Sequence, residues 1–182
     1  MNGHPSLPRA PGGGRATAGY LIEAATPADV PAIHALIRAL AQYERLGHLC
    51  VATEADVAGA LFGARPLAEV LIARNPEKNG EDVGFAVFFH TWSTFLGRPS
   101  LWLEDLFVRP EHRRAGIGRA LLMRLAALAV ERGCGRFEWS VLDWNASAIR
   151  FYEGLGASVL SDWRICRVTG QALARLAADE GT

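Results

Sequence analysis

Two arginines and two glycines stand close together in the segment RPEHRRAGIGRAL, residues 109–121. The segment follows the apolar run LWLEDLFV and leads into a pattern with helical spacing. A helix N-terminus presents unpaired N–H groups and a partial positive charge, glycine lets a ligand approach the backbone, and arginine attracts phosphate. The segment therefore predicts a site for a phosphorylated ligand, and the alternative is a basic, solvated loop that caps a helix.

Three phosphate-binding patterns can be compared with this segment. A nucleotide P-loop requires GxxxxGK followed by Ser or Thr, and no such pair follows these glycines. A dinucleotide fingerprint requires GxGxxG/A in a parallel βαβ unit, but Leu121 occupies the third position. The pattern Arg/Gln-x-x-Gly-x-Gly/Ala is matched in full by Arg113, Gly116 and Gly118. The spacing favours this third pattern.

Length and composition are those of one folded domain. The chain has 182 residues, 50% of them hydrophobic, and a formal net charge of zero. This balance argues against a disordered chain and against a nucleic-acid-binding protein, which usually carries a basic excess. No apolar run approaches the roughly 20 residues that span a bilayer, and the Gly- and Pro-rich start is not a secretory signal. We therefore expect a flexible leader, residues 1–18, and a single domain, residues 19–178.

The cysteines and histidines indicate the cellular compartment and whether the sequence contains a metal-binding pattern. Cys50, Cys134 and Cys166 are widely spaced and contain no CxxC pair. This pattern favours a reducing cytoplasm and indicates neither a disulfide framework nor zinc. His48 and His112 stand alone in polar segments, and we expect both to be solvated. The sequence thus predicts a cytoplasmic protein that needs no metal.

Apolar periodicity and capping signals predict alternating strands and helices. Thr26 with Asp29 and Thr53 with Asp56 have the spacing of helix-capping pairs. The order predicts a mixed α/β sheet with antiparallel neighbours rather than a regular βαβ array. Strands are expected at 20–25, 68–74, 83–93, 101–108 and 136–143, with a final extended segment at 157–170; helices are expected at 26–41, 53–61, 117–132, 145–156 and 171–180.

The chain resembles the GNAT superfamily of N-acetyltransferases, whose pyrophosphate-binding turn has the third pattern above. The segment NASAIRFYEGLGA, residues 145–157, is similar to the family's second segment facing coenzyme A. With YERL, LWLEDLFV, the pair Trp144-Asn145 and the late DWR, it resembles the diamine N-acetyltransferases, which include the spermidine/spermine and thialysine enzymes. The resemblance runs from about Tyr20 to Leu176. It implies the GNAT fold, a mostly antiparallel sheet flanked by helices, with acetyl-CoA as cosubstrate and a homodimer.

The implied reaction poses two proton problems. An alkylammonium has a pKa near ~10, so about one molecule in a thousand is the free base at neutral pH. The leaving thiolate, with a pKa of ~8.5 by analogy with cysteine, benefits from a proton donor. The site therefore needs an acceptor near the amine and a donor near the sulfur.

Tyr152 and Glu104 are the residues expected to meet these needs. The resemblance implies that Tyr152 is the general acid, and the alternative is a core aromatic beside Phe151. Glu104 lies in an apolar strand next to Asp105, and because adjacent strand residues point to opposite faces, we expect the two carboxylates to do different jobs. The alternative for each is an ion pair with a nearby arginine. With a reference pKa near ~4, Glu104 is expected mainly to bind and orient the cation.

The resemblance also implies which residues contact the two substrates. For Phe107 and Val108 the contact is a main-chain one, and simple core packing is the alternative. Cofactor contacts are implied for Leu106, Phe107, Val108, Arg113, Arg114, Ala115, Gly116, Ile117, Gly118, Arg119, Asn145, Ala146, Ser147 and Ala148. Substrate contacts are implied for Tyr43, Glu44, Glu104, Asp105, Glu138, Trp139 and Ser140.

The acceptor amine is less well defined by the sequence. Polyamine enzymes of this group tend to carry further acids after the YE pair, whereas this chain continues ERLGHLC, and Arg150 adds a positive charge near Tyr152. A shorter amine or a lysine-like or thialysine-type substrate is therefore more plausible than spermidine or spermine. Two other functions stay open: a non-catalytic acyl-CoA-binding regulatory module, and acetylation of a peptide amine. The presence of both Glu104 and Tyr152 favours the enzyme.

Overall fold

The computed structural model describes residues 15–17 and 19–178. The chain divides into two compact units, Met1–Ser140 and Val141–Thr182. No helix in the described part is long and apolar enough to cross a membrane. Of the expected leader, Arg15–Thr17 form a short strand, and the other residues up to 18 lie outside the described residues.

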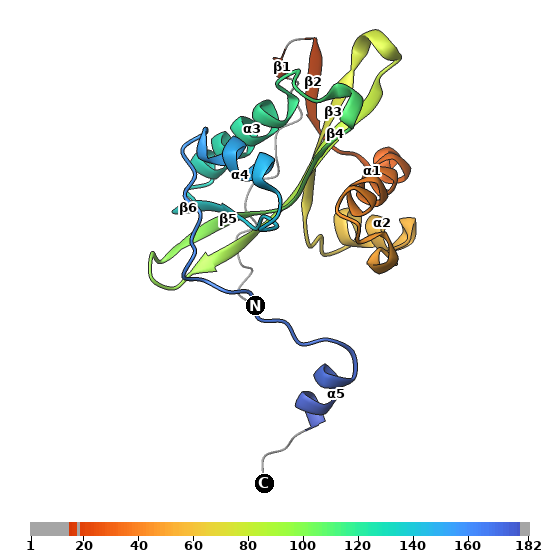
Figure 1. Cartoon of the computed structure of the whole chain (residues 1–182). Helices are drawn as coiled ribbons and strands as arrows, with labels where there is room; N and C mark the ends of the chain where they lie inside the picture. The colour runs from red at the N-terminus through yellow and green to blue at the C-terminus, as the bar shows by residue number, and fades with distance from the viewer. Residues whose placement is uncertain (1–14, 18, 179–182) are drawn as a thin grey trace. The chain divides into compact units, whose positions relative to one another are not determined.

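A six-stranded sheet forms the first unit, in the order β1-β2-β3-β4-β5-β6 (Figure 1). Every neighbouring pair is antiparallel except β5 and β6, which are parallel. The prediction of a mixed, mostly antiparallel α/β sheet is confirmed. The strands are β1 (Arg15–Thr17), β2 (Tyr20–Ala24), β3 (Glu69–Asn75), β4 (Glu81–Ser93), β5 (Arg98–Val108) and β6 (Arg136–Trp139).

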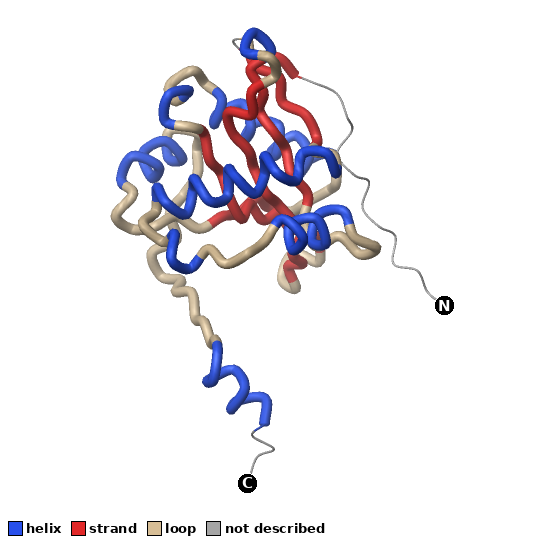
Figure 2. Tube along the Cα trace, turned by 90° about the vertical axis from the view of Figure 1, so that its right-hand side faces the viewer, coloured by secondary structure: helices blue, strands red, loops and turns tan. Residues whose placement is uncertain are grey.

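Three α-helices of the first unit cover the two faces of this sheet. Figure 1 shows α1 (Val30–Tyr43) and α2 (Glu54–Phe62) on one face and α3 (Ile117–Glu131) on the other, and Figure 2, with the side of α1 and α2 toward the viewer, shows the strands behind a layer of helix. Both expected capping pairs form, because the Asp29 carboxylate accepts from Thr26 and the Asp56 carboxylate accepts from Thr53. Short 3-10 turns η1 (Pro27–Asp29), η2 (Gly47–Leu49), η3 (Pro76–Lys78) and η4 (Pro110–His112) complete the connections.

Apolar side chains bury both faces of the sheet. On one face, Ile33 and Leu36 of α1 pack with Ile72 and Phe85 in a single core cluster. On the other, the predicted stripe of α3 is completely buried, with Leu121 and its helical neighbours at 0–1% exposure. Burying a leucine or isoleucine contributes about 1.5–3 kcal/mol, so the two layers hold the sheet rigidly between the helices.

Strand β5 carries an extra residue at Glu104. Val87 of β4 pairs with Asp105, but the next residue, Phe88, pairs with Leu103, so Glu104 has no opposite partner. Such a bulge shifts the alternation of faces by one residue. Leu103 therefore shares a face with Phe88, whereas Asp105 shares the α1 face with Val87.

The end of β5 lies very close to β4. A methyl group at Gly84 would come within 2.7 Å of the Phe107 carbonyl oxygen and 3.2 Å of Val108 Cγ2. Only glycine permits this approach, which fixes the end of β5 where the glycine-rich turn begins. The Arg109 amide continues the pairing by donating to the Val83 carbonyl oxygen at 2.8 Å.

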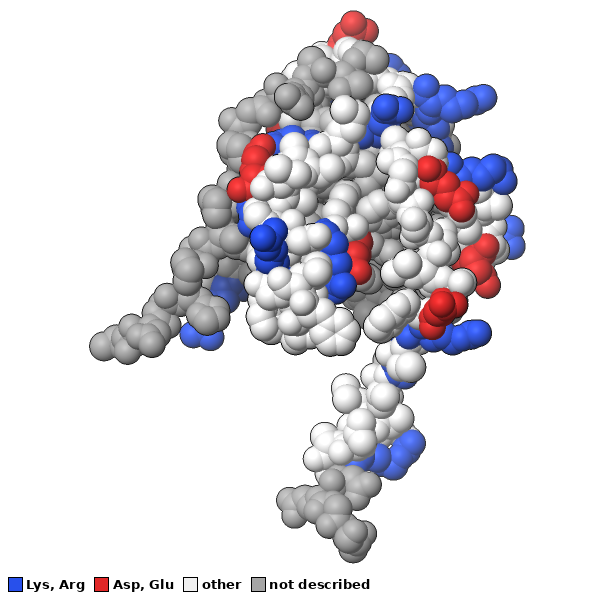
Figure 3. Space-filling view, turned by 90° about the vertical axis from the view of Figure 1, so that its left-hand side faces the viewer, with Lys and Arg blue, Asp and Glu red and all other residues white. Residues whose placement is uncertain are grey.

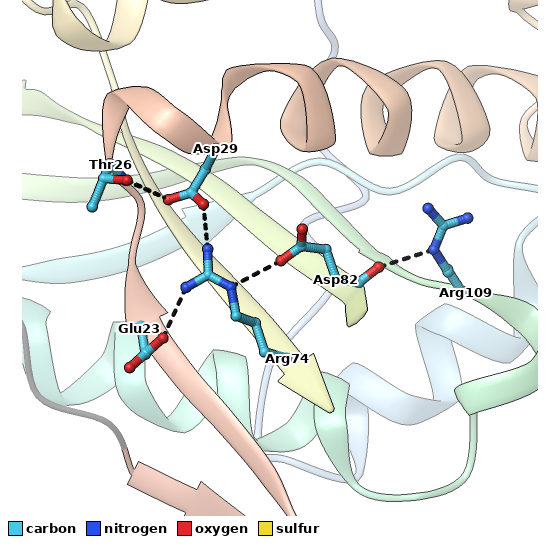
Figure 4. Close-up of polar contacts among 6 residues, drawn as sticks. All are labelled: Glu23, Thr26, Asp29, Arg74, Asp82 and Arg109. Carbon is cyan, nitrogen blue, oxygen red and sulfur yellow. Dashed lines mark hydrogen bonds and ion pairs between the residues drawn. The ribbon is translucent and has the colours of Figure 1, made fainter. Parts of the chain in front are cut away.

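Arg74 joins three acidic side chains at the edge of the first unit (Figure 4). Its guanidinium pairs with Glu23 at 2.8 Å, with Asp82 at 3.0 Å and with Asp29. Burial alone would raise the pKa of Asp29. Hydrogen bonds from the Thr26 amide and hydroxyl, together with the charge of Arg74, lower that pKa overall. The Asp82 carbonyl oxygen in turn accepts from Arg109 Nε at 3.0 Å. The network thus ties β2, η1, β3 and β4 to the segment that leads into the turn.

The second unit contains two helices and irregular segments. Helices α4 (Ala146–Glu153) and α5 (Gly170–Ala178) confirm the expected helices near 145–156 and 171–180. Two strand predictions were wrong. The expected strand 136–143 ends at Trp139, because its pairing with β5 stops at Leu103, directly before the bulge. The segment 157–169 contains no strand, because its extended apolar pattern has no paired edge among the described strands.

A pair of glycine substitutions tests the close approach of β4 and β5. Gly84→Ala places a Cβ against a backbone oxygen that cannot move aside, so we expect a loss of about 1–3 kcal/mol in the free energy of unfolding. Gly59→Ala in α2 meets nothing within 4 Å and should stabilise the helix by about 0.5–1 kcal/mol. Urea unfolding of both variants measures the difference. Equal stability of the two variants would contradict the steric argument.

Candidate active site

The glycine-rich turn has the backbone geometry of an anion-binding loop. Arg114 and Gly116 both have positive φ, 66° and 80°, and Gly116 caps the start of α3. The Ala120 amide makes the first helical bond, to the Gly116 carbonyl oxygen at 3.0 Å, so the amides of Ile117 and Gly118 precede the intrahelical ladder. No side chain caps this end within the described chain. Backbone amides in such a turn form a concave site for phosphate.

Arg113 holds the turn against the rest of the unit. Its Nε donates to the Val108 carbonyl oxygen at 3.0 Å. Its guanidinium carbon lies 4.3 Å from the centre of the Tyr43 ring and 5.7 Å from that of Phe107. These contacts use Nε and one face of the guanidinium, so Arg113 positions the loop, although its side chain is exposed like those of Arg114 and Arg119. The contact also brings an expected substrate residue, Tyr43, next to the expected cofactor turn.

Three carboxylates gather where the C-terminus of α1 meets the bulge of β5. Glu44 caps α1, and Glu104 accepts a hydrogen bond from Trp102 Nε1 at 3.0 Å. The expectation that Glu104 and Asp105 point to opposite faces was wrong. Glu104 stays on the same side as Trp102, two residues before it, and the bulge turns Asp105 to that side as well. Within the described part of the chain, neither carboxylate forms an ion pair with an arginine.

The electrostatics of this cluster follow from burial and like charge. Burial, with smaller contributions from the charges of Glu104 and Glu44, raises the pKa of Asp105 from 3.8 to about 6. Burial also raises the pKa of Glu44. Carboxylates whose pKa values are raised in this way bind a cation strongly, because a positive charge relieves both the repulsion and the desolvation. The sequence indicated the three acids but not the raised pKa of Asp105.

A pocket of about 180 Å³ opens beside the cluster. Glu44 and Asp105 supply its carboxylates. The rest of the lining is apolar or small and comes from α1 and the segment around η2: Ile37, Leu40, Ala41, Leu46, Leu49 and Cys50. A small apolar pocket with acidic groups suits an alkyl chain that ends in an ammonium group.

The free edge of β5 lies next to the carboxylates. Strand β6 pairs with β5 only from Ser100 to Leu103, so among the described strands the segment from Glu104 to Val108 pairs with β4 alone. This leaves one edge with main-chain groups able to pair with an extended ligand. The segment contains Leu106, Phe107 and Val108, for which main-chain cofactor contacts were expected.

Strand β6 brings its expected substrate residues beside the start of this edge. Glu138 lies opposite Trp102, and Trp139 lies opposite Leu103, with Ser140 directly after the strand. The Glu138 carboxylate is already paired with Arg136 Nε at 2.7 Å. Glu138 is therefore less available to a cationic substrate than Glu44 or Asp105.

Helix α4 of the second unit collects the remaining expected residues. The Asn145 side chain caps this helix, accepting from the Ala148 amide at 3.3 Å and from the Ser147 hydroxyl at 3.1 Å. Tyr152 is half-buried on the same helix, with its ring centre 5.4 Å from that of Phe151. Asn145 thus begins the helix; the catalytic role of Tyr152 and the cofactor contacts of residues 145–148 stay predictions.

His112 was expected in solvent, and this expectation was wrong. The side chain is buried, with 6% exposure, and its Nδ1 lies 3.2 Å from the Tyr20 hydroxyl. A polar segment predicts exposure only on average, and here η4 folds back onto the start of β2. His48 is exposed as expected.

Charged side chains of both signs are mixed over the surface. Figure 3 shows acidic side chains next to basic ones on one face of the described chain. This mixture accords with the formal net charge of zero.

Comparison with known proteins identifies the family. The model of the acetyltransferase (GNAT) family matches residues 54–157. L-ornithine N5-acetyltransferase NATA1 of Arabidopsis thaliana is 38% identical over 194 aligned residues, which cover 84% of this chain and 85% of the relative. Thialysine N-epsilon-acetyltransferase of Sus scrofa is 35% identical, covering 88% of this chain and 98% of the relative. An integron cassette protein of V. cholerae has a TM-score of 0.73 at 26% identity, covering 87% of this chain and 98% of that one.

The chain belongs to the acetyltransferase (GNAT) family. It is an N-acetyltransferase, and its relatives confirm the resemblance to the diamine and thialysine group.

Asp105→Asn tests the electrostatic cost of the cluster. Below about pH 4 the carboxyl is protonated in both folded and unfolded chains. Between about pH 4 and pH 6 the unfolded chain has lost the proton while the folded chain keeps it, so the free energy of unfolding falls over this range and stays low above it. We expect the variant to be more stable than wild type near pH 8, on the order of 2 kcal/mol, with no gain near pH 4.

Thermal unfolding at the two pH values measures this difference, with exposed Asp143→Asn as the matched control. A variant that is destabilised equally at both pH values would show that the Asp105 carboxylate makes a net favourable contact.

Proposed function

We propose that this enzyme transfers the acetyl group of acetyl-CoA to the side-chain amine of a small substrate related to ornithine, lysine or thialysine. The observation that carries the proposal is the cluster of Glu44, Glu104 and Asp105 beside a small, largely apolar pocket. The attacking nitrogen is a cation before it reacts, so a site for it must combine negative charge with room for an alkyl chain. The cluster supplies both.

The turn and the free edge of β5 would hold acetyl-CoA. The amides from Arg114 to Arg119 would bind the pyrophosphate, since positive φ at Arg114 and Gly116 directs successive amides into one concave surface. The main chain of Leu106, Phe107 and Val108 would pair with the pantetheine arm along the edge that β6 leaves open. Asn145, Ala146, Ser147 and Ala148 are proposed as the second contact with the cofactor, on the grounds of the family resemblance.

Glu104 and Asp105 are proposed to share the work at the amine. Glu104 is exposed and fixed by Trp102, so it suits binding and orientation of the incoming cation. Asp105, whose pKa burial raises to about 6, is ionised at neutral pH and can take up a proton near that pH, so it suits the role of proton acceptor. A bound ammonium group still lies roughly 4 pKa units above it, so the pair binds mainly the ammonium form, and only the small fraction that has given up its proton attacks the thioester.

Tyr152 is proposed to protonate the leaving thiolate of coenzyme A. Its phenol is a neutral donor at physiological pH, and it lies in the FYEGLGA segment that resembles the corresponding segment of the family. Attack of the amine nitrogen on the thioester carbonyl forms a C–N bond and breaks the C–S bond. The amine proton passes to the carboxylate pair, and the phenol proton passes to sulfur.

The relatives and the pocket together favour a short substrate. The two relatives described above are named for ornithine and thialysine, each an amino acid with a terminal amine. The pocket, with a volume of about 180 Å³, is small for a long polycation. Because Glu138 is paired with Arg136, few carboxylates remain to bind several positive charges. A homodimer and a cytoplasmic location stay predictions, the first from the resemblance and the second from the cysteine pattern.

Substrate choice and mechanism can be tested by thiol release from acetyl-CoA with a panel of amines. The panel contains ornithine, thialysine, lysine, putrescine, spermidine and a short peptide. We expect ornithine or thialysine to give the highest kcat/KM. Turnover of the peptide alone would favour the peptide acetyltransferase, and tight binding of coenzyme A without turnover of any amine would contradict the proposal.

Variants separate the proposed roles. Tyr152→Phe should lower kcat by about 100-fold or more, because general acid catalysis contributes at least that much. The exposed neighbour Glu153→Gln on the same helix serves as its control. Asp105→Asn should remove the acidic limb of the kcat/KM profile near pH 6, whereas Glu104→Gln should mainly raise KM. A limb that persists in Asp105→Asn would assign the acceptor role to another group.

A further inference from the structure

A histidine and two carboxylates meet at a second place in the first unit. Glu81 begins β4, and Glu111 and His112 belong to η4, directly before the glycine-rich turn. One donor atom from each of the three side chains lies within 4.8 Å of the other two. None of the three belongs to the acidic cluster or pocket described above, so this group is independent of the proposed acetyl transfer.

The His112 ring presents an unsatisfied nitrogen to these carboxylates. The side chain is buried, with 6% exposure, and Nδ1 is engaged with the Tyr20 hydroxyl at 3.2 Å. Nε2 lies 3.4 Å from Glu81 Oε2 but makes no hydrogen bond within the described chain. A buried polar atom without a partner costs free energy. A cation coordinated by His112 Nε2 and by both carboxylates would remove this cost.

We propose that Glu81, Glu111 and His112 bind a divalent transition-metal ion of the zinc class. Imidazole nitrogen and carboxylate oxygen are both zinc ligands, at about 2.0–2.2 Å from the ion. Two donors at that distance in a tetrahedral site lie roughly 3.4 Å apart, which is the separation between His112 Nε2 and Glu81 Oε2. The open position of the coordination shell is left to water.

Tyr20 prepares the histidine for this role. When Nδ1 donates its proton to the Tyr20 hydroxyl oxygen, the lone pair on Nε2 faces Glu81 and Glu111. Ligating histidines are oriented in this way by an acceptor on their other nitrogen. The bound ion links the start of β4 to η4 and thereby holds the segment that enters the glycine-rich turn.

Metal binding to the full-length protein tests the proposal directly. After chelation and dialysis, titration with Zn²⁺ is expected to show one tight site per chain and a melting temperature that rises with Zn²⁺ concentration. His112→Gln and Glu81→Gln should both abolish that site. Tyr20→Phe should weaken it about tenfold, since loss of an orienting partner costs 10–100-fold in metal affinity. Exposed His48→Gln should bind like wild type.

Co²⁺ as a probe distinguishes the proposed ligands from the cysteines. Cys50, Cys134 and Cys166 are free thiols in the structure. The proposed site predicts d–d absorption bands of bound Co²⁺ that disappear in Glu81→Gln. Because the Glu81 side chain lies at the surface, this substitution is expected to leave the fold intact. A thiolate charge-transfer band would overturn the proposal in favour of a cysteine site, and binding that survives His112→Gln and Glu81→Gln together would place the ion elsewhere. No binding at all would reduce the group to an imidazole–carboxylate contact.

Discussion

The extra residue in β5 interrupts its ladder with β4, and most features of the acidic site follow from that interruption. The bulge at Glu104 turns Asp105 onto the same side as Glu104, next to Glu44 at the end of α1. Pairing with β6 stops one residue earlier, at Leu103, so the following segment of β5 keeps a free edge. One inserted residue thus places the acids for an amine beside an edge that can pair with an extended cofactor.

Two arginines stabilise the elements around this irregularity without taking part in the proposed chemistry. Arg74 pairs with three acids and ties the start of α1 to β3 and β4, while the Asp82 carbonyl oxygen holds Arg109 (Figure 4). Arg113 fastens the turn to the end of β5 and to Tyr43. Within the described chain neither arginine forms an ion pair with Glu44, Glu104 or Asp105, so the negative charge of the cluster remains available to a cation.

The free energy of the cluster is unfavourable by itself. Three carboxylates in a partly buried region repel one another and lose hydration, which is why the pKa of Asp105 rises to about 6. The apolar layers on both faces of the sheet offset this cost, with large side chains such as Phe85 and Leu121 completely buried. A substrate ammonium group would recover part of this electrostatic cost on binding. The cost therefore contributes to the affinity of the cluster for a cation.

The sequence by itself determined the fold class, the capped helices, the buried stripe of α3 and the glycine-rich turn, because caps, periodicity and glycine positions act through near neighbours in the chain. It also indicated Glu44, Glu104 and Asp105 as acids of one site through family resemblance. Only the tertiary structure decided that Glu104 and Asp105 share a face, because a bulge depends on the register of the partner strand. It likewise decided the burial of His112, the end of β6 at Trp139 and the commitment of Arg113 to Tyr43. Each of these depends on contacts between segments far apart in the chain, which local sequence patterns do not encode.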